Sequence, residues 1–305
     1  MPPAASGSRG SESVYPCIPH DNACRPPLLL ICLSNMPELP EVEVTRLGVA
    51  RVAIGQHIRG ARLGKPLRWP LGIEVSDLLG RQIVGLRRRG KYLLMDLDQG
   101  ILLWHLGMSG SIQIGAALGP AGPHDHFDLQ GDSVSLRLHD PRRFGAVVFA
   151  ESESSVEATK LLQHLGVEPL TDAFNAREFH ARLQQKKAPI KAVLLGGELV
   201  VGVGNIYASE ALFRAGIHPK RAANRISLAR VERLVNAIKG VLTRAIAAGG
   251  SSLKDFRHAD GELGYFQLET RVYERGGLPC FVCEEPITRI VQGQRATYYC
   301  KRCQT

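Results

Sequence analysis

Four cysteines near the end of the chain restrict its fold more than any other feature of the sequence. They follow the pattern Cys280-x2-Cys283-x16-Cys300-x2-Cys303. Two thiol pairs with two-residue gaps can each hold one edge of a tetrahedral zinc ion, as in zinc ribbons, with disulfides as the alternative. The other cysteines lie in the first 35 residues, at Cys17, Cys24 and Cys32. A disulfide framework for the bulk of the chain is therefore excluded, and we predict one structural Zn2+ in the tail.

The segment between the two cysteine pairs, ITRIVQGQRATYY, has the alternation of a β-hairpin. A hairpin carrying Arg289 and Arg295 could lie against nucleic acid, whereas the alternative is a structural staple for a small subdomain. Across the whole chain, 38 Lys and Arg residues face 29 Asp and Glu residues, a net charge of +9. This excess points to an anionic partner, most commonly nucleic acid, although a solvated basic surface has the same composition.

The length of 305 residues is sufficient for two domains with their own cores. With 44% hydrophobic residues and no apolar run near the ~18 residues of a bilayer-spanning helix, a membrane protein and a mainly disordered protein are excluded. Residues 1–35 hold six of the 18 prolines, and we predict that they are disordered or artefactual. Their apolar stretch Leu28–Leu33 is too short for a signal peptide, so secretion is not expected.

The segment MPELPEVEVTRLGVARV, which starts at Met36, is compatible with a helix or a strand. Val42 and Val44 alternate as in a strand. The prolines followed by Glu41 and Glu43 suit a helix start, where acids meet the positive end of the dipole, and we favour the helix.

Strand signals dominate residues 82–151, where short apolar runs alternate with Gly, Asp and Pro. The predicted strands are Tyr92–Leu97, Ile101–Leu106, Phe127–Leu129, Val134–Leu138 and Ala146–Phe149, with a turn at Asp98-Gln99-Gly100. Sequential short strands with hairpin-length turns predict an antiparallel sandwich or barrel.

The period becomes helical from about Ser155. Apolar residues at spacings of three and four predict a helix from a Ser227 N-cap to Gly249, and a shorter helix spans Tyr207 to Ala215. We therefore expect five segments. They are an extension (1–35), a β-rich domain (36–165), a linker GVEPLTD (166–172), a helical domain (173–270) and a zinc finger (271–305).

Seven motifs occur in order together with the zinc cysteines: PELPEVE (37–43), RRRGKYLL (87–94), HLGMSG (105–110), HDHFDL (124–129), DPRRFG (140–145), VGVGNIYASE (201–210) and QRATYYC (294–300). This set closely resembles the bacterial formamidopyrimidine-DNA glycosylase family over residues 36–305. The resemblance implies an α+β fold. An N-terminal antiparallel β-sandwich with flanking helices would precede a helical domain with a helix–two-turn–helix motif and a zinc-ribbon β-hairpin.

The resemblance also implies an activity, that of a bifunctional DNA glycosylase and apurinic/apyrimidinic (AP) lyase of base excision repair. Such an enzyme excises 8-oxoguanine and formamidopyrimidines from double-stranded DNA and then cuts the strand by β,δ-elimination. A monomer in the bacterial cytoplasm is expected. The alternatives are the sister endonuclease for oxidised pyrimidines and, if the N-terminal extension is retained, a non-catalytic zinc-ribbon DNA-binding protein.

Catalytic roles follow from the same resemblance. The family's nucleophile is an N-terminal proline amine exposed by removal of methionine, and it maps to Pro37; such an amine can form an iminium ion. Glu38 maps to the essential acid. Glu41 maps to a supporting carboxylate, for which helix capping is an equally good explanation. Lys91 is placed with them, although a lysine at a strand start can also protect a sheet edge.

DNA contacts are implied for a further group of residues. An enzyme that extrudes a nucleotide must hold the flanking phosphates, and Lys91 shares this role with His124, Asn205 and Arg295. Asn205 has independent support, since glycines before a helix start form a nest of backbone donors. Arg143 is also expected to bind DNA. The residues expected to enter the duplex are a flexible apolar group, a flat cation and an aromatic wedge: Met108, Arg142 and Phe144.

Two departures from the family pattern affect these expectations. Glu262 stands in the loop Arg257–Phe266 where some members carry a lysine, so recognition of the flipped base by this position is in doubt. The residues before Pro37 would convert its amine into an unreactive amide. Either translation starts at Met36 or the first 35 residues are removed.

Overall fold

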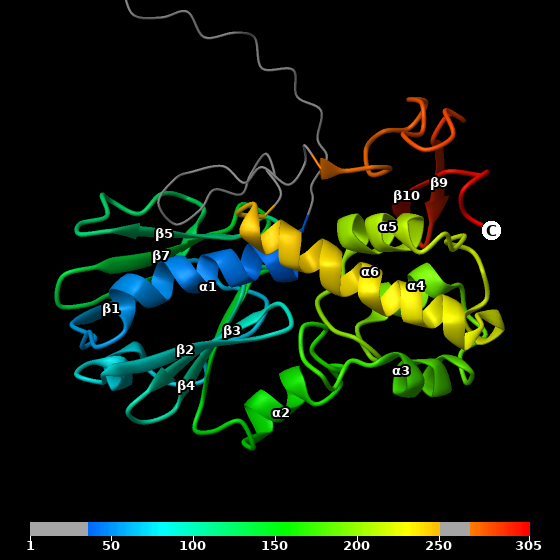
Figure 1. Cartoon of the computed structure of the whole chain (residues 1–305). Helices are drawn as coiled ribbons and strands as arrows, with labels where there is room; N and C mark the ends of the chain where they lie inside the picture. Colours follow the sequence, from blue (N-terminus) through cyan, green and yellow to red (C-terminus); the bar gives the residue numbers. More distant parts are fainter. Residues whose placement is uncertain (1–35, 251–268) are drawn as a thin grey trace, which may run out of the picture. The chain divides into compact units, whose positions relative to one another are not determined.

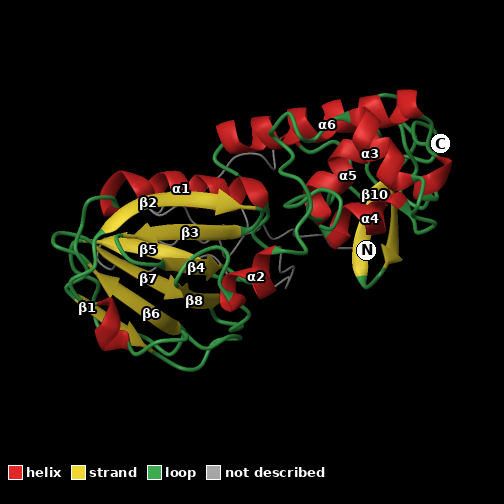
Figure 2. Cartoon of the chain, turned by 90° about the horizontal axis from the view of Figure 1, so that it is seen from below, coloured by secondary structure: helices red, strands yellow, loops and turns green. Residues whose placement is uncertain are grey.

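Two four-stranded antiparallel sheets make up the N-terminal half of the protein (Figure 1, Figure 2). The computed structural model describes residues 36–250 and 269–305. One sheet has the order β1 (Gly60–Leu63), β6 (Asp125–Gln130), β7 (Ser135–His139) and β5 (Ser111–Gly115). The other has the order β2 (Ile83–Arg89), β3 (Tyr92–Leu97), β4 (Ile101–His105) and β8 (Ala146–Ala150). The sequence predicted a sandwich or a barrel, and the two separate sheets show that the sandwich is correct.

The five predicted strands coincide with β3, β4, β6, β7 and β8 to within two residues at each end. The predicted turn joins β3 to β4, where the N–H of Leu97 donates to the carbonyl of Gly100 (2.9 Å). No run was predicted for β1, β2 or β5. β2 ends in three arginines, whose charge conceals the spacing of its buried Ile83 and Leu86.

Strand β4 is buried on both faces, which explains its unbroken apolar sequence. Leu102 and Trp104 belong to the main core, whereas Leu103 on the other face belongs to a second cluster with Leu161 of α2 (Val156–Leu162). The main core continues through α1 into the helical half and reaches Cys300. The sandwich, the helices and the zinc module therefore share apolar packing.

Helix α1 (Leu39–Ala53) confirms the helical interpretation of the opening segment. Its residues Leu39, Val42 and Val49 are buried, and the helix contacts β2 and α6. At its start, the N–H of Glu38 donates to Oε2 of Glu41 (2.9 Å), so the acid in the first turn satisfies a backbone donor that has no partner within the helix.

The C-terminal half contains helices and the zinc hairpin. They are α3 (Ala176–Leu183), α4 (Ile190–Gly196), α5 (Asn205–Arg214), α6 (Leu228–Ala247), β9 (Thr288–Gln292) and β10 (Arg295–Tyr299). Short 3-10 helices cover Val75–Leu78 and Ala223–Arg225. Helix α6 follows Ser227 as predicted, with its apolar residues buried. Helix α5 begins two residues before its predicted start because Gly204, not the tyrosine, ends the extended segment.

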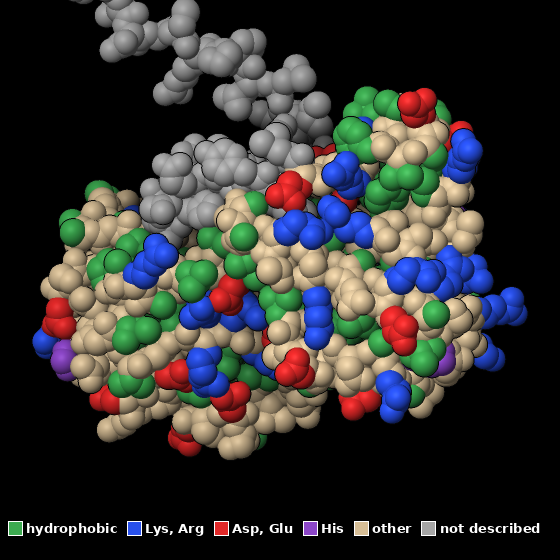
Figure 3. Space-filling view, viewed as in Figure 1, with side chains coloured by type: hydrophobic (Ala, Val, Ile, Leu, Met, Phe, Trp, Pro, Cys, Tyr) green, Lys and Arg blue, Asp and Glu red, His purple; other side chains and the backbone are tan. Residues whose placement is uncertain are grey.

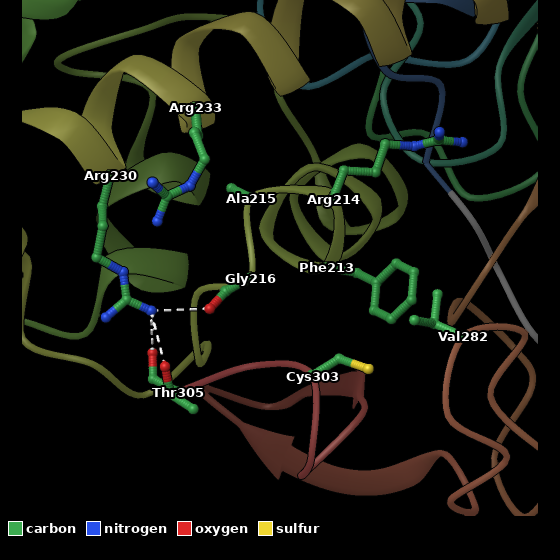
Figure 4. A pocket seen from close by; sticks show the side chains of 9 residues that line it. All are labelled: Phe213, Arg214, Ala215, Gly216, Arg230, Arg233, Val282, Cys303 and Thr305. Atoms are coloured by element: carbon green, nitrogen blue, oxygen red, sulfur yellow. Dashed lines mark hydrogen bonds between the residues drawn. The ribbon is translucent and has the colours of Figure 1, made fainter.

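The end of the chain is tied to the helical half (Figure 4). Nη2 of Arg230 in α6 donates to the carbonyl of Gly216 (2.8 Å) and to Oγ1 of Thr305 (3.0 Å). The amide of Gln304 donates to the carbonyl of Ile217 (2.9 Å). These bonds attach the zinc module to the turn that follows α5.

Within the described ranges, 36–250 and 269–305, no helix combines the length and the apolar character needed to cross a bilayer. The predicted extension 1–35 and the loop Arg257–Phe266, which includes Glu262, lie outside these ranges.

Candidate active site

Glu38 connects the two halves of the protein. It precedes α1, yet its carboxylate accepts hydrogen bonds from the N–H groups of Ile206 (3.0 Å) and Tyr207 (3.4 Å) in the first turn of α5. Those amides have no partner within their helix, and the positive end of the helix dipole faces the carboxylate. A residue of the sandwich thus caps a helix of the other half.

The environment of Glu38 brings its protonation equilibrium close to neutral pH. Burial raises its pKa to about 7, while the positive charge of Lys91 opposes this rise and the negative charge of Glu41 adds to it. A carboxyl group with a pKa near the working pH can both donate and accept a proton.

Gly204 makes room for this carboxylate. A Cβ on Gly204 would lie 2.1 Å from Cδ of Glu38, and a Cβ on Gly202 would lie 2.7 Å from Cβ of Leu39. The N–H of Leu39 also donates to the carbonyl of Gly202 (3.2 Å). The glycine-rich lead-in to α5, which the sequence pattern assigned to phosphate binding, therefore also admits Glu38.

Glu41 is fully buried between α1 and α5. Its Oε2 caps α1 through the N–H of Glu38, and its Oε1 accepts the hydroxyl proton of Tyr207 (2.5 Å). The capping explanation offered by the sequence is thus realised, and a supporting role for Glu41 in catalysis stays a prediction.

Lys91 follows a tight turn between β2 and β3. Gly90 occupies this turn with φ +58°, and a Cβ there would lie 2.4 Å from Cγ2 of Val201. Glu168, in the predicted linker, accepts the N–H of Gly90 (2.6 Å) and pairs with Arg88 (2.8 Å). The turn that presents Lys91 is therefore held from both sides by segments of the helical half.

Two lysines, Lys91 and Lys191, interact electrostatically with Glu38, and Arg295 interacts with both lysines. Burial lowers the pKa of Lys91 and also that of Lys191, the latter to about 7; in both cases the charge of Glu38 opposes the shift and that of Arg295 adds to it. Lys191 belongs to α4, is 1% exposed and donates to Oγ1 of Thr297 in β10 (2.7 Å). Sequence reasoning missed Lys191, although a lone lysine in the apolar run of α4 was a usable signal.

The two hairpin arginines lie on opposite faces of the zinc hairpin. Arg295 pairs with Gln292, and Arg289 pairs with Tyr298. Because side chains alternate along a strand, Arg295 shares its face with Thr297, which contacts α4, while Arg289 lies on the other face. The two arginines therefore extend from different faces of the hairpin, and contact of the hairpin with nucleic acid stays a prediction.

Asn205, the first residue of α5, is held by a tyrosine that sequence reasoning missed. Burial raises the pKa of Tyr273, and a hydrogen bond with the Asn205 side chain opposes this rise. The N–H groups of Tyr273 and Val272 both donate to Oε1 of Glu210 (2.9 Å each), a fully buried residue of α5. Helix α5 therefore carries Asn205 and also anchors the segment that supports it.

His105 is a third residue that sequence reasoning missed, although it stands in the HLGMSG motif. Its Nδ1 accepts the N–H of Gly107 (3.0 Å), so the neutral ring carries its proton on Nε2 and can donate it to a ligand. Burial lowers the pKa of His105 to about 4, and the nearby charge of Lys91 contributes to this shift. His105 is therefore a neutral hydrogen-bond donor beside Lys91.

Met108, Arg142 and Phe144 lie on two loops that touch. A Cβ on Gly107 (φ +67°) would lie 2.5 Å from the carbonyl carbon of Phe144, so the two backbones are in close contact. The guanidinium of Arg142 lies 5.1 Å from the ring centroid of Phe144, which is 43% exposed. Arg143 is exposed, with φ +55°. The structure thus brings the three predicted inserting residues together, and Phe144 lies outside the core.

His124 lies next to these loops, in the segment before β6, and is exposed. Its carbonyl accepts the N–H of Asp140 (2.8 Å), and its ring packs edge-on against His139 with centroids 5.9 Å apart. The contacts of His124 therefore connect it with the insertion loops, the two loops that carry Met108, Arg142 and Phe144, whereas the contacts of His105 connect that residue with Lys91.

The four C-terminal cysteines form one cluster whose Sγ atoms lie within 4.8 Å of one another. Cys283 lies 3.4 Å from both Cys300 and Cys303, and Cys280 lies 3.9 Å from Cys303. Four thiolates about 2.3 Å from a tetrahedral zinc ion lie about 3.8 Å apart, which these separations match. The N–H of Val282 also donates to the sulfur of Cys280 (3.5 Å). The residues fit one structural zinc ion.

Comparisons with known proteins agree with this geometry. Three family models match. They are the formamidopyrimidine-DNA glycosylase N-terminal domain (36–147), the H2TH domain of the same glycosylase (165–257) and the zinc finger found in FPG and IleRS (277–305). The formamidopyrimidine-DNA glycosylase of Polaromonas naphthalenivorans is 59% identical over 269 residues, covering 88% of this chain and 99% of that protein. The chain belongs to the formamidopyrimidine-DNA glycosylase family.

Solved structures of formamidopyrimidine-DNA glycosylases have the same fold. The Fpg protein of Thermus thermophilus superposes with a TM-score of 0.81 at 40% identity, covering 88% of this chain and 98% of that one. A mutant of Lactococcus lactis Fpg in complex with Fapy-dG-containing DNA gives 0.82 at 32% identity, covering 88% and 100%. The predicted α+β architecture, with its sandwich, helical H2TH domain and zinc finger, is confirmed.

As a formamidopyrimidine-DNA glycosylase, the protein is a DNA glycosylase of base excision repair, and the family also has AP lyase activity. Its zinc finger and cysteine cluster agree with the predicted single structural zinc. Lys and Arg side chains gather in groups over the helical half on the face shown in Figure 3, which suits a polyanionic substrate.

Proposed function

We propose that this glycosylase excises oxidised purines, 8-oxoguanine and formamidopyrimidines, from double-stranded DNA, with the secondary amine of Pro37 as nucleophile. The observation that supports this most is the position of Pro37 next to Glu38, a buried carboxyl group with a pKa near 7 that interacts with Lys91 and Lys191. Structures of the Lactococcus lactis relative hold DNA with Fapy-dG or an abasic site, which supports the same substrate class here.

The reaction follows from the chemistry of a secondary amine. The nitrogen of Pro37 attacks C1′ of the damaged nucleotide, the bond from C1′ to the base breaks, and the base leaves with the proton that the amine loses. Protonated Glu38 gives its proton to the sugar ring oxygen, which opens the ring and leaves an iminium ion between Pro37 and C1′. The iminium withdraws electrons from the sugar, so that β- and then δ-elimination release the 3′ and 5′ phosphates.

Holding the extruded nucleotide requires cations and donors on both sides of the lesion. We assign phosphate binding to Lys91, Asn205 and Arg295 around Glu38, and we add neutral His105 as a donor. His124 and Arg143 are assigned to DNA beside the insertion loops. The residues that fill the space left in the duplex are Met108, Arg142 and Phe144.

The domain division that we propose follows the sequence boundaries, with the sandwich at 36–165, a linker at 166–172, the helical domain at 173–270 and the zinc finger at 271–305. We place the enzyme in the cytoplasm, where bacterial chromosomal DNA lies, and we expect it to act as a monomer.

A free amine at Pro37 is the condition on which the mechanism depends. An amide nitrogen is not nucleophilic, so the active form begins at Pro37, and the residues before it are absent or removed. The family model for the N-terminal domain begins at residue 36, which agrees with this requirement.

Borohydride trapping tests the proposal. A protein that begins at Pro37 should become covalently attached to a duplex with 8-oxoguanine when borohydride reduces the iminium ion, whereas the 305-residue chain should not. Glu38→Gln in the shorter protein should still bind the duplex but lose base excision. Equal trapping by both forms would overturn the assignment of Pro37 and make Lys91 the first candidate nucleophile. If neither form is trapped although both bind the duplex, no amine of the protein attacks C1′, and the proposed mechanism is wrong.

A further inference from the structure

We propose that Asp140 is a positioning residue that joins the two insertion loops into a single rigid wedge. The insertion loops are Gly107–Gly110, which carries Met108, and Pro141–Gly145, which carries Arg142 and Phe144. The inference rests on the proposed function, because it assumes that these side chains enter the DNA duplex.

The carboxylate of Asp140 bonds to both loops at once. It is fully buried, and its Oδ1 accepts the hydroxyl proton of Ser109 (2.7 Å) and the N–H of Arg142 (3.2 Å). Its Oδ2 accepts the N–H of Gly145 (2.7 Å). Ser109 is the residue after Met108, so one acceptor group fixes the backbone beside each inserting residue. Three donors converge on this carboxylate, and an amide in its place would direct N–H groups at one of them.

Asp140 is itself fixed from outside the loops. Its N–H donates to the carbonyl of His124 (2.8 Å), and its carbonyl lies 3.0 Å from Nε2 of His126, which is 1% exposed and belongs to β6. The carboxylate is therefore anchored to a strand of the sandwich and transmits that fixed position to both loops.

The loops have no space to move independently. A Cβ on Gly107 would lie 2.5 Å from the backbone nitrogen of Gly145, so a shift of one loop displaces the other. Asp140 and Ser109 lie inside, whereas Arg142 and Phe144 point to solvent. The buried hydrogen bonds of Asp140 thus hold together two loops that are distant in sequence, and the exposed side chains of these loops lie next to one another.

The test uses DNA binding by the full 305-residue chain, which does not need the amine of Pro37. The damaged probe is a duplex with a tetrahydrofuran abasic analogue and 2-aminopurine opposite it, and the reference is the undamaged duplex. In Asp140→Asn, the preference for the damaged duplex should fall about tenfold or more, because small misplacements of positioned groups have effects of this order. Affinity for the undamaged duplex should stay within about twofold, and the 2-aminopurine fluorescence change should be lost.

Asp128→Asn is the matched control, because Asp128 is a buried aspartate of β6 that bonds to Arg62 and Arg137 and not to the loops. It should keep the preference for damaged DNA even if it lowers the melting temperature. If Asp140→Asn does not fold, Ser109→Ala decides, since it removes one donor and should lower the preference about threefold.

A double-mutant cycle separates positioning from a general structural role. In the wild-type background, the effects of Met108→Ala and Phe144→Ala on the preference for damaged DNA should be strongly non-additive. When Asp140→Asn or Ser109→Ala is also present, the effects of the same two changes should be nearly additive. A folded Asp140→Asn protein that keeps its preference, or an equal loss in Asp128→Asn, would overturn the role of Asp140. Absence of any preference in the wild-type protein would instead overturn the proposed function, and the wedge with it.

Discussion

The hydroxyl of Tyr207 donates a 2.5 Å hydrogen bond to Glu41, which joins the first turns of α1 and α5 beneath Glu38. Both residues are at most 1% exposed. Tyr207 also donates its backbone N–H to Glu38, so one residue of α5 contacts both carboxylates. The position of Glu38 relative to α5 therefore depends on this pair.

Tyr207→Phe should destabilise the protein by about 1–3 kcal/mol, because it leaves a fully buried carboxylate without one donor. For a protein of this size, this corresponds to a fall in melting temperature of about 2–4 °C per kcal/mol. Urea unfolding of Tyr207→Phe, Glu41→Gln and the double variant measures the effect. The two changes should be non-additive; additive effects would show that the hydrogen bond does not contribute to stability.

Glu38 should make the protein less stable as the pH rises from 5 to 8. Burial raises its pKa from 4.5 to about 7, so the folded state keeps a proton that the unfolded chain releases. This contribution is complete below pH 4.5, and it is lost as the pH rises through about 7. Glu38→Gln should remove this part of the pH dependence, which amounts to a few kcal/mol at most, at about 1.4 kcal/mol per pKa unit. The free energy of unfolding at pH 5 and pH 8 provides the measurement, and identical slopes for both proteins would refute the shift.

Lys191 should make the protein more stable as the pH rises, which is the opposite of the effect of Glu38, and it should do so at higher pH. Burial lowers its pKa from 10.5 to about 7, so stability rises between these values and is lost as the pH falls through 7. Lys191→Met should flatten the increase between pH 7 and pH 9.5 in thermal unfolding. Lys186→Met is the control, since Lys186 is 39% exposed and pairs with Glu198 at the surface. If the melting temperature of Lys191→Met rises between pH 7 and pH 9.5 as steeply as that of the wild-type protein, Lys191 is not the cause of the rise.

Arg295→Ala should weaken binding to damaged and undamaged duplexes alike and reduce the salt dependence of log Kd by about one unit of slope. Arg289→Ala, on the opposite face of the same hairpin, is the matched control and should leave the slope unchanged. Fluorescence anisotropy over a series of salt concentrations distinguishes the two. Equal losses would mean that the hairpin face does not decide DNA contact.

Removal of zinc should unfold more than the tail. Cys300 and Ile287 belong to the core shared with the helical half, and Lys191 of α4 bonds to Thr297 of the hairpin. Chelation, or Cys300→Ser, should therefore abolish DNA binding and destabilise the helical half, while the sandwich still unfolds cooperatively. Elemental analysis, limited proteolysis and DNA affinity before and after chelation test this. Absence of metal in reduced protein, or undiminished binding after its removal, would refute it.

The features that the sequence predicted well are those encoded by local spacing. The period of α6, the alternation and turn of β3 and β4, and the paired cysteines each depend on residues close together in the chain. The surroundings of Glu38, in contrast, are formed by residues far apart in the chain. Its donors are backbone N–H groups 168 and 169 positions away, which leave no side-chain pattern to recognise. Local patterns could therefore place Glu38 only at the start of its own helix, and its assignment as the essential acid came from the family resemblance.

Lys191, Tyr273 and His105 were missed for a related reason. Each of these residues lies in a segment that local sequence patterns explain without assigning it a role in the site. Each comes close to the site only when elements distant in the sequence pack together. The lone lysine in an apolar run and the histidine of the HLGMSG motif were usable signals, but the chemical roles of all three residues depend on burial in the folded chain.

The use of backbone donors for Glu38 has a consequence for chimeric enzymes. The amides of residues 206 and 207 are present with any residue except proline at these positions, so the helical half of a divergent relative could replace this one without loss of that contact. Gly204 is the exception, because a Cβ there would lie 2.1 Å from the carboxyl carbon of Glu38. Compatibility between exchanged halves should thus depend on the absence of a side chain at position 204 and on a tyrosine at position 207 more than on overall similarity.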